Sequence, residues 1–228
     1  MRIFEYSNKG SRDTNQDFII HKSLSEKATV VVVADGMGGY SYGEIASHVI
    51  GQSIIDYVQA NFDKESPALL LKESISFAND SLMLKRLSLG AKHMGAVVVV
   101  LLVIDNEAYM TWLGDSRIYI YRGGVEVYKT EDHSVINELS KIKSLTNVNL
   151  EKYSSVVTRS IMGDDNLGKV EVSHLSVFEG DVFVLCTDGF YKENVVSDAV
   201  YYDDSKKTDF DNKALMMSDN YSFAKLEI

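Results

Sequence analysis

The sequence contains a single cysteine and a single proline among its 228 residues. One thiol cannot form an internal disulfide, which is consistent with a reducing compartment. Cys186 ends an apolar run at residues 182–186, and this setting favours a small buried side chain over a reactive thiol. With only Pro67, no proline-rich linker separates domains. We therefore expect a cytoplasmic protein with one domain over residues 1–228.

No apolar run is long enough to cross a membrane, and positive charge is scarce. The longest run, residues 94–104, is far shorter than the roughly 20 residues of a spanning helix, and the N-terminus lacks an export signal. The 23 lysines and arginines stand against 33 aspartates and glutamates, a formal net charge of -10. Such a chain repels phosphate backbones. We expect a soluble monomer that binds neither membranes nor nucleic acid.

Short apolar segments predict strands, and two longer ones predict helices. Residues 29–33 are so continuously apolar that we expect burial on both faces of that strand. Residues 43–62 and 66–89 have the apolar spacing of amphipathic helices. Strands are predicted at residues 3–6, 18–20, 29–33, 97–104, 108–113, 117–121, 125–128, 170–172, 182–186 and 222–228.

The middle of the chain has a more detailed local pattern. The strands predicted within residues 97–128 are separated by turn residues, and we interpret them as an antiparallel meander. Ser134 precedes an apolar pattern in the manner of a helix N-cap. Residues 141–155 are polar and weakly patterned, and we expect a mobile segment there.

Aspartates follow or touch several of the predicted strands. The strand at residues 29–33 leads through Ala34 into Asp35, and Gly36, Gly38 and Gly39 follow in a tight glycine-rich segment. Hard cations such as Mg²⁺ and Mn²⁺ prefer carboxylate and carbonyl oxygens. Two such ions about 3.5–4 Å apart can activate a water for in-line attack on phosphorus. Arg12 is suited to grip a phosphate dianion through two hydrogen bonds.

Each of these features also has a purely structural explanation. An Asp-Gly pair is commonly an ordinary turn, and Asp115 is compatible with a turn after a strand. Arg12 alone would be a solvated surface arginine in most proteins. The combination of all of them favours metal-dependent phosphate chemistry.

The combined motifs closely resemble the metal-dependent serine/threonine protein phosphatases of type 2C, in their compact bacterial form. The resemblance runs from about residue 7 to residue 228, and its motifs occur in the family's order. They are residues 12–17, 35–39, 114–117 with Tyr119 and Arg122, 132–134, 158–159, 187–189 and 219–220. The resemblance implies an α+β fold, a four-layer α-β-β-α sandwich with two central antiparallel sheets.

The resemblance also implies a site for two Mg²⁺ or Mn²⁺ ions and a weaker third one. Asp35 would bridge the two ions, and Asp115 would join Asp188 at the third site. Asp17 would act through bound water, and Arg12 would bind the substrate phosphate. The implied metal ligands are Asp17, Asp35, Gly36, Asp115, Asp188 and Asp219.

The implied activity is hydrolysis of phosphoserine and phosphothreonine in proteins by a water activated between two metal ions. The implied partners are a phosphorylated protein substrate and a serine/threonine kinase or its targets. A second hypothesis is a pseudophosphatase that binds a phosphoprotein without hydrolysis, although no metal carboxylate is lost here. A third is a phosphatase that acts mainly as a docked regulator.

The chain departs from the family pattern at several positions. Met37 stands where many eukaryotic relatives carry a proton-donating histidine, and Ala96 and Val97 replace two threonines. We expect these losses to loosen the support around the carboxylates without abolishing it. The region before Asp219 is short and polar, which makes its assignment less secure. For His133 we favour a structural role over general acid catalysis.

Overall fold

The structure is a computed structural model that describes residues 1–37, 42–141, 150–153 and 156–228. Gly38, Gly39 and most of the segment at residues 141–155 therefore lie outside the described residues. Among the described residues, no helix is both long enough and apolar enough to cross a membrane.

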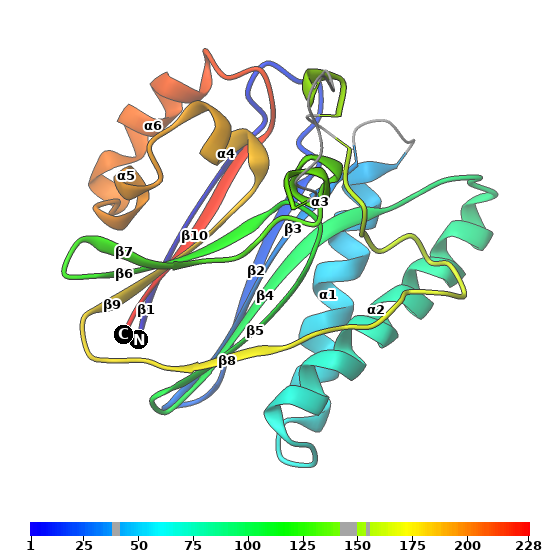
Figure 1. The fold of residues 1–228 in the computed structure, drawn as a ribbon, viewed down its shortest axis with the longest axis horizontal. Coiled ribbons are helices and arrows are strands. Elements are labelled where there is room, and N and C mark those ends of the chain that lie inside the picture. The colour runs from blue at the N-terminus through cyan, green and yellow to red at the C-terminus, as the bar shows by residue number, and fades with distance from the viewer. Residues whose placement is uncertain (38–41, 142–149, 154–155) are drawn as a thin grey trace.

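Two five-stranded antiparallel sheets pack face to face (Figure 1). The first sheet has the order β1-β10-β9-β6-β7, with bounds Arg2–Asn8, Tyr221–Glu227, Asp181–Cys186, Arg117–Arg122 and Val125–Lys129. The second has the order β2-β3-β4-β5-β8, with bounds Asp17–Ser25, Ala28–Gly36, Ala96–Ile104, Glu107–Leu113 and Ser173–Ser176. This architecture confirms the expected α+β fold with two central antiparallel sheets.

Helices cover the outer face of each sheet (Figure 1). The long helices α1 (Gly43–Asn61) and α2 (Pro67–Leu89) pack on the second sheet, as the apolar spacing predicted. The short helices α4 (Asp188–Glu193), α5 (Ser197–Val200) and α6 (Lys207–Ala214) cover the first sheet. Single 3₁₀ turns lie at Leu150–Tyr153 and Asp204–Lys206.

A further short helix, α3 (Val135–Ser140), begins where its predicted cap stands. The Ser134 hydroxyl accepts a hydrogen bond of 3.2 Å from the Asn137 amide. This bond satisfies one of the free N–H groups of the first turn, and it confirms the N-cap prediction.

The run of valines in β3 forms two apolar layers at once. Val30 and Val32 face the helices, while Val31 and Val33 face the opposite sheet, because successive side chains of a strand point to opposite faces. All of these side chains are fully buried, which confirms the prediction for residues 29–33. The middle layer fixes how the two sheets sit on each other.

A third apolar layer between the first sheet and α4–α6 is rich in aromatic rings. Phe223 of β10 lies at its centre, with ring centroids 4.8 Å from Phe190, 5.1 Å from Tyr202 and 5.4 Å from Phe210. Cys186 is fully buried in the same layer, and burial raises the pKa of its thiol. These observations confirm the prediction of a small buried side chain at Cys186.

The predicted meander at residues 97–128 is wrong. The strands β4 and β5 pair in the second sheet, whereas β6 and β7 pair in the first. The chain crosses between the sheets at Gly114, whose φ of 116° is available to glycine. A Cβ at Gly114 would lie 2.2 Å from the side chain of Val97, so no other residue fits this crossing.

The strand predicted at residues 170–172 is also misplaced, because β8 begins at Ser173. Val170 and Val172 pack against the layer under the helices but do not join the ladder. The Thr111 hydroxyl donates to the Glu171 carbonyl at 2.7 Å, in place of a backbone bond. Apolar packing alone explains the alternating pattern.

We expect the substitution Phe223→Ala to lower the free energy of unfolding by about 3–5 kcal/mol, because it opens a cavity among packed rings. Urea denaturation followed by circular dichroism measures this loss. Leu87→Ala, at an exposed position of α2, is the control, and its effect should stay within about 0.5 kcal/mol. Equal effects of the two substitutions would contradict the central role of the aromatic layer.

Candidate active site

Asp17 and Asp35 face each other across the ladder of β2 and β3. Asp17 is the first residue of β2, and its register partner is Asp35, next to the last residue of β3. Opposite residues of an antiparallel pair project their side chains to the same face. Strand pairing therefore forces two carboxylates together at one end of the second sheet.

The other predicted carboxylates reach the same place from the first sheet and from the crossing between the sheets. Asp188 follows β9 and begins α4, and Asp219 precedes β10, the strand next to β9. Asp115 lies directly after the crossing at Gly114. The charges of Asp17, Asp188, Asp115 and Asp219 all raise the pKa of Asp35. The structure thus brings together all the predicted carboxylates.

Burial and mutual repulsion raise the pKa values of these groups. The pKa of Asp35 lies well above its ordinary range, first through desolvation and then through the neighbouring carboxylates. Burial and the same repulsion raise the pKa of Asp17 to about 7, and desolvation and Asp188 raise that of Asp115 to about 6. Such a group of like charges is favourable only with cations nearby.

Only one of the two Asp17 carboxylate oxygens has a hydrogen-bond partner in the protein. The Thr187 hydroxyl donates to its Oδ2 at 3.0 Å, whereas Oδ1 is buried and has no hydrogen-bond partner. A buried carboxylate oxygen without a partner is costly, and a metal ion or its water would satisfy it. This orphaned oxygen fits the divalent ions that the resemblance implies.

Gly36 is in a backbone cradle that excludes every side chain. A Cβ at this position would lie 2.3 Å from the Gly43 carbonyl oxygen and 2.9 Å from that of Gln16. The Gly36 amide donates to the Gln16 carbonyl at 3.0 Å, which holds the segment beside Asp35. The backbone of Gly36 is thus held tightly beside Asp35, in a position that only glycine can occupy.

Two cations of the chain already pair with the outer carboxylates. Arg12 donates through Nη2 to Asp219 at 2.9 Å, and Lys192 lies 2.6 Å from Asp188. Among the described residues, no group of three His, Cys, Asp or Glu side chains is arranged to hold a metal ion. The outer carboxylates Asp219 and Asp188 are thus each compensated by a cation of the chain itself.

Asn220 ties the loop that carries Arg12 to the strand that follows Asp219. Its side-chain amide donates to the carbonyls of Lys9 and Thr14 at 3.0 Å each, and its oxygen accepts from the Gln16 amide at 2.8 Å. In the sequence, Asn220 is recognisable only as part of the motif at residues 219–220, and no role could be assigned to it. Three hydrogen bonds from one buried amide fix the position of the Arg12 loop.

The remaining arginine motifs form ion pairs within the fold. Arg117 binds both oxygens of Asp132 at 2.7 Å, and its guanidinium lies 3.6 Å from the ring centre of Tyr191. Arg122 binds both oxygens of the fully buried Asp181 at 2.7 and 2.8 Å. These contacts support the structural explanation of this hairpin.

His133 also makes structural contacts. Its amide donates to the Gly114 carbonyl at 2.8 Å, and its Nδ1 accepts from the Gly114 amide at 3.3 Å. The ring stacks on Trp112, and burial lowers the pKa of the imidazole. His133 therefore holds the residue next to Asp115, in agreement with the structural role favoured from the sequence.

The family departures lie directly beside the carboxylates. Val97 pairs in register with Asp35, and Ala96 pairs with Gly36. Among the described residues, none donates a side-chain hydrogen bond to Asp35, so the two lost hydroxyls are not replaced. The Met37 amide donates to the Gly95 carbonyl at 3.1 Å, which attaches the residue after Gly36 to the residue before β4.

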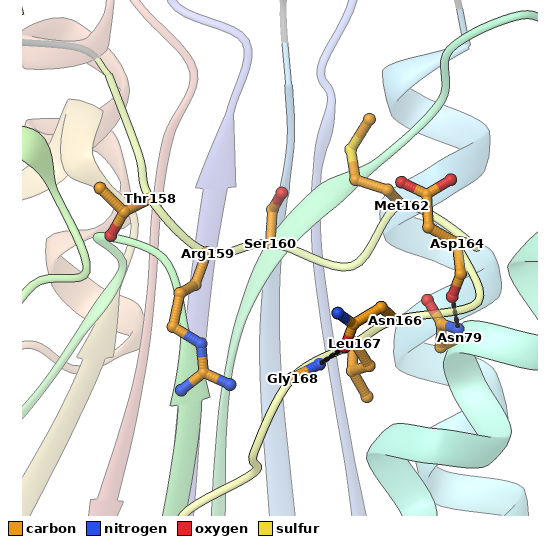
Figure 2. Close-up of a pocket in the computed structure, with 9 residues that line it drawn as sticks. All are labelled: Asn79, Thr158, Arg159, Ser160, Met162, Asp164, Asn166, Leu167 and Gly168. Atoms are coloured by element: carbon orange, nitrogen blue, oxygen red, sulfur yellow. Dashed lines mark hydrogen bonds between the residues drawn. The ribbon is translucent and has the colours of Figure 1, made fainter.

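A pocket of about 350 Å³ adjoins this region (Figure 2). It is lined by Asn79, Thr158, Arg159, Ser160, Met162, Asp164, Asn166, Leu167 and Gly168. Met162 and Met37 meet over Gly95, where an added Cβ would lie 2.3 Å from the Met162 sulfur and 2.5 Å from the Met37 methyl carbon. Arg159 donates to the Lys169 carbonyl at 2.5 Å.

The model of the protein phosphatase 2C family matches residues 6–223. The chain belongs to this family. Protein phosphatase PhpP of Streptococcus pneumoniae is 30% identical over 182 residues, which cover 78% of this chain and 74% of PhpP. Serine/threonine phosphatase stp of Listeria innocua is 29% identical over 187 residues, covering 76% of this chain and 70% of stp.

Solved structures of phosphatases share the fold. The catalytic domain of serine/threonine protein phosphatase PstP, in complex with two manganese ions, superposes with a TM-score of 0.76 at 20% identity. The match covers 98% of this chain and 96% of that one. This chain is thus a homologue of protein serine/threonine phosphatases in a metal-dependent family, and phosphoproteins are the substrates of that class.

The raised carboxylate pKa values predict a pH dependence of stability in the metal-free protein. Between the ordinary aspartate pKa and about 7, the folded state holds protons that the unfolded state has lost, so stability falls as pH rises. Thermal unfolding in chelator should show a lower Tm at pH 8 than at pH 5. Asp35→Asn should flatten this slope, whereas Asp80→Asn on the exposed side of α2 should leave it unchanged. If Tm depended on pH in the same way in all three proteins, repulsion between the carboxylates would not be the cause of the pH dependence.

Proposed function

We propose that this chain hydrolyses phosphoserine and phosphothreonine in proteins with the help of two Mg²⁺ or Mn²⁺ ions. The observation that supports this most directly is the pairing of Asp17 and Asp35 across one ladder, surrounded by three more carboxylates. A group of neighbouring carboxylates such as this one is suited to binding divalent cations. Membership in the protein phosphatase 2C family supports the same function.

We assign the ligands as the resemblance to the family implies. Asp35 would bind both ions. One of these ions would also be bound by the Gly36 carbonyl, Asp188 and Asp219. Asp17 would act through a bound water. Asp115 and Asp188 would form the weaker third site. Such ions supply activation of a water nucleophile and neutralisation of charge on the phosphoryl group. The bridging role suits Asp35 because it interacts with every other carboxylate of the site.

Arg12 would grip the substrate phosphate at the edge of this site. In the structure only its Nη2 is engaged, by Asp219, and the side chain is 52% exposed. The Nε and Nη1 groups donate to no described residue, which leaves planar donors for a phosphate dianion. Asn220 supports this role because it fixes the loop on which Arg12 stands.

We further propose that one copy of the chain suffices and acts as one catalytic domain. Both sheets of the same chain contribute carboxylates to the site, and no ligand is needed from a second copy.

Asp35→Asn should reduce phosphate release from a phosphothreonine peptide to background while the protein stays folded, because the bridging charge is lost. The measurement is phosphate release with Mn²⁺ and with chelator, with circular dichroism as the folding check. Asp80→Asn is the matched control and should retain full turnover. Full activity of Asp35→Asn, or turnover in chelator, would disprove the metal-dependent mechanism. A folded wild-type protein that binds Mn²⁺ without turnover would favour the pseudophosphatase.

Arg12→Ala should reduce kcat/KM by about 10- to 150-fold. Hydrogen bonds to a charged group contribute about 1.5–3 kcal/mol, which corresponds to this range of rates. Arg2→Ala, in an exposed ion pair with Glu227, is the control and should behave as wild type. An unchanged kcat/KM in Arg12→Ala would remove this residue from the site.

A further inference from the structure

Lys192 is the inner cation of the carboxylate cluster. It stands in the last turn of α4, one helical turn after Asp188, and its Nζ lies 2.6 Å from Asp188 Oδ2. The Lys192 side chain is 41% exposed and that of Asp188 is 21% exposed, so water screens this pair only in part. The helix places the ammonium group at the carboxylates and limits how far it can move away.

The charge of Lys192 acts on more than Asp188. The carboxylates of Asp188, Asp115 and Asp35 all act electrostatically on its ammonium group, which Asp188 contacts directly at 2.6 Å. The ammonium group is therefore the charge that compensates the pair formed by Asp115 and Asp188.

A side chain of α4 is also attached to the backbone of Asp115. The Tyr191 hydroxyl donates to the Asp115 carbonyl at 3.0 Å, and the ring of Tyr191 is covered by Arg117. Consecutive residues of α4 thus hold Asp115 through a hydrogen bond and compensate its carboxylate through a charge. This attachment keeps Lys192 next to Asp115 and not only next to Asp188.

We propose that Lys192 is a built-in counter-cation of the Asp115 and Asp188 pair, and that it weakens the binding of a third divalent ion there. A divalent ion at this pair would be repelled by the ammonium group and would have to displace it from Asp188. The chain then holds two ions tightly and a third only at high metal concentration. This inference rests on the proposed function, since it assumes the same metal ligands.

The test is a titration of the metal-free wild-type protein with Mn²⁺, with free Mn²⁺ counted by electron paramagnetic resonance. We expect two tight sites. In Lys192→Met, which keeps the length of the side chain but removes the charge, the third site should bind at least about tenfold more tightly. Lys192→Arg keeps the charge and should behave as wild type. Identical binding isotherms for wild type and Lys192→Met would overturn the inference, as would three tight sites in the wild type.

Further variants separate this inference from the proposed function. Adding Asp115→Asn to Lys192→Met should remove the gained site, and its persistence would place the gain elsewhere and overturn the inference. Asp35→Asn should lose the two tight ions. A folded wild-type protein that binds no Mn²⁺ at all would instead overturn the proposed metal centre. Far-ultraviolet circular dichroism establishes that each variant is folded before its titration is interpreted.

Discussion

The repulsion between Asp17 and Asp35 is the constraint on which the rest of the site depends. Strand pairing places the two carboxylates opposite each other, where burial makes the charge of Asp35 costly and the charge of Asp17 adds to that cost. The fold can maintain this arrangement because β3 and β4 are buried on both faces between apolar layers. The hydrophobic core therefore supplies the free energy that holds like charges together.

The two sheets contribute different halves of the site. Asp17 and Asp35 belong to the second sheet, whereas Asp188 and Asp219 flank β9 and β10 of the first. The separation of these halves is set by the middle apolar layer, which contains residues of both sheets. Interiors packed at crystal-like density transmit changes of volume, so a substitution in this layer would also shift the carboxylates.

Much of the fold and the site could be predicted from local sequence. Asp35 could be placed because its strand is continuously apolar and ends in glycines. The sheet that each strand joins could not be predicted, because strands on both sides of Gly114 have the same alternation and only a backbone angle redirects the chain. Lys192 was missed because its partner depends on α4 beginning at Asp188, after which the spacing of four residues is evident.

The first and last strands of the sandwich, β1 and β10, pair directly, so the two ends of the chain lie side by side (Figure 1). The Asn220 side chain bonds to Lys9 across 211 positions of sequence. Contacts between such distant residues form slowly, because a long loop must close first. The loop that carries Arg12 is consequently fixed in place late, after β10 has been synthesised and has paired with β1.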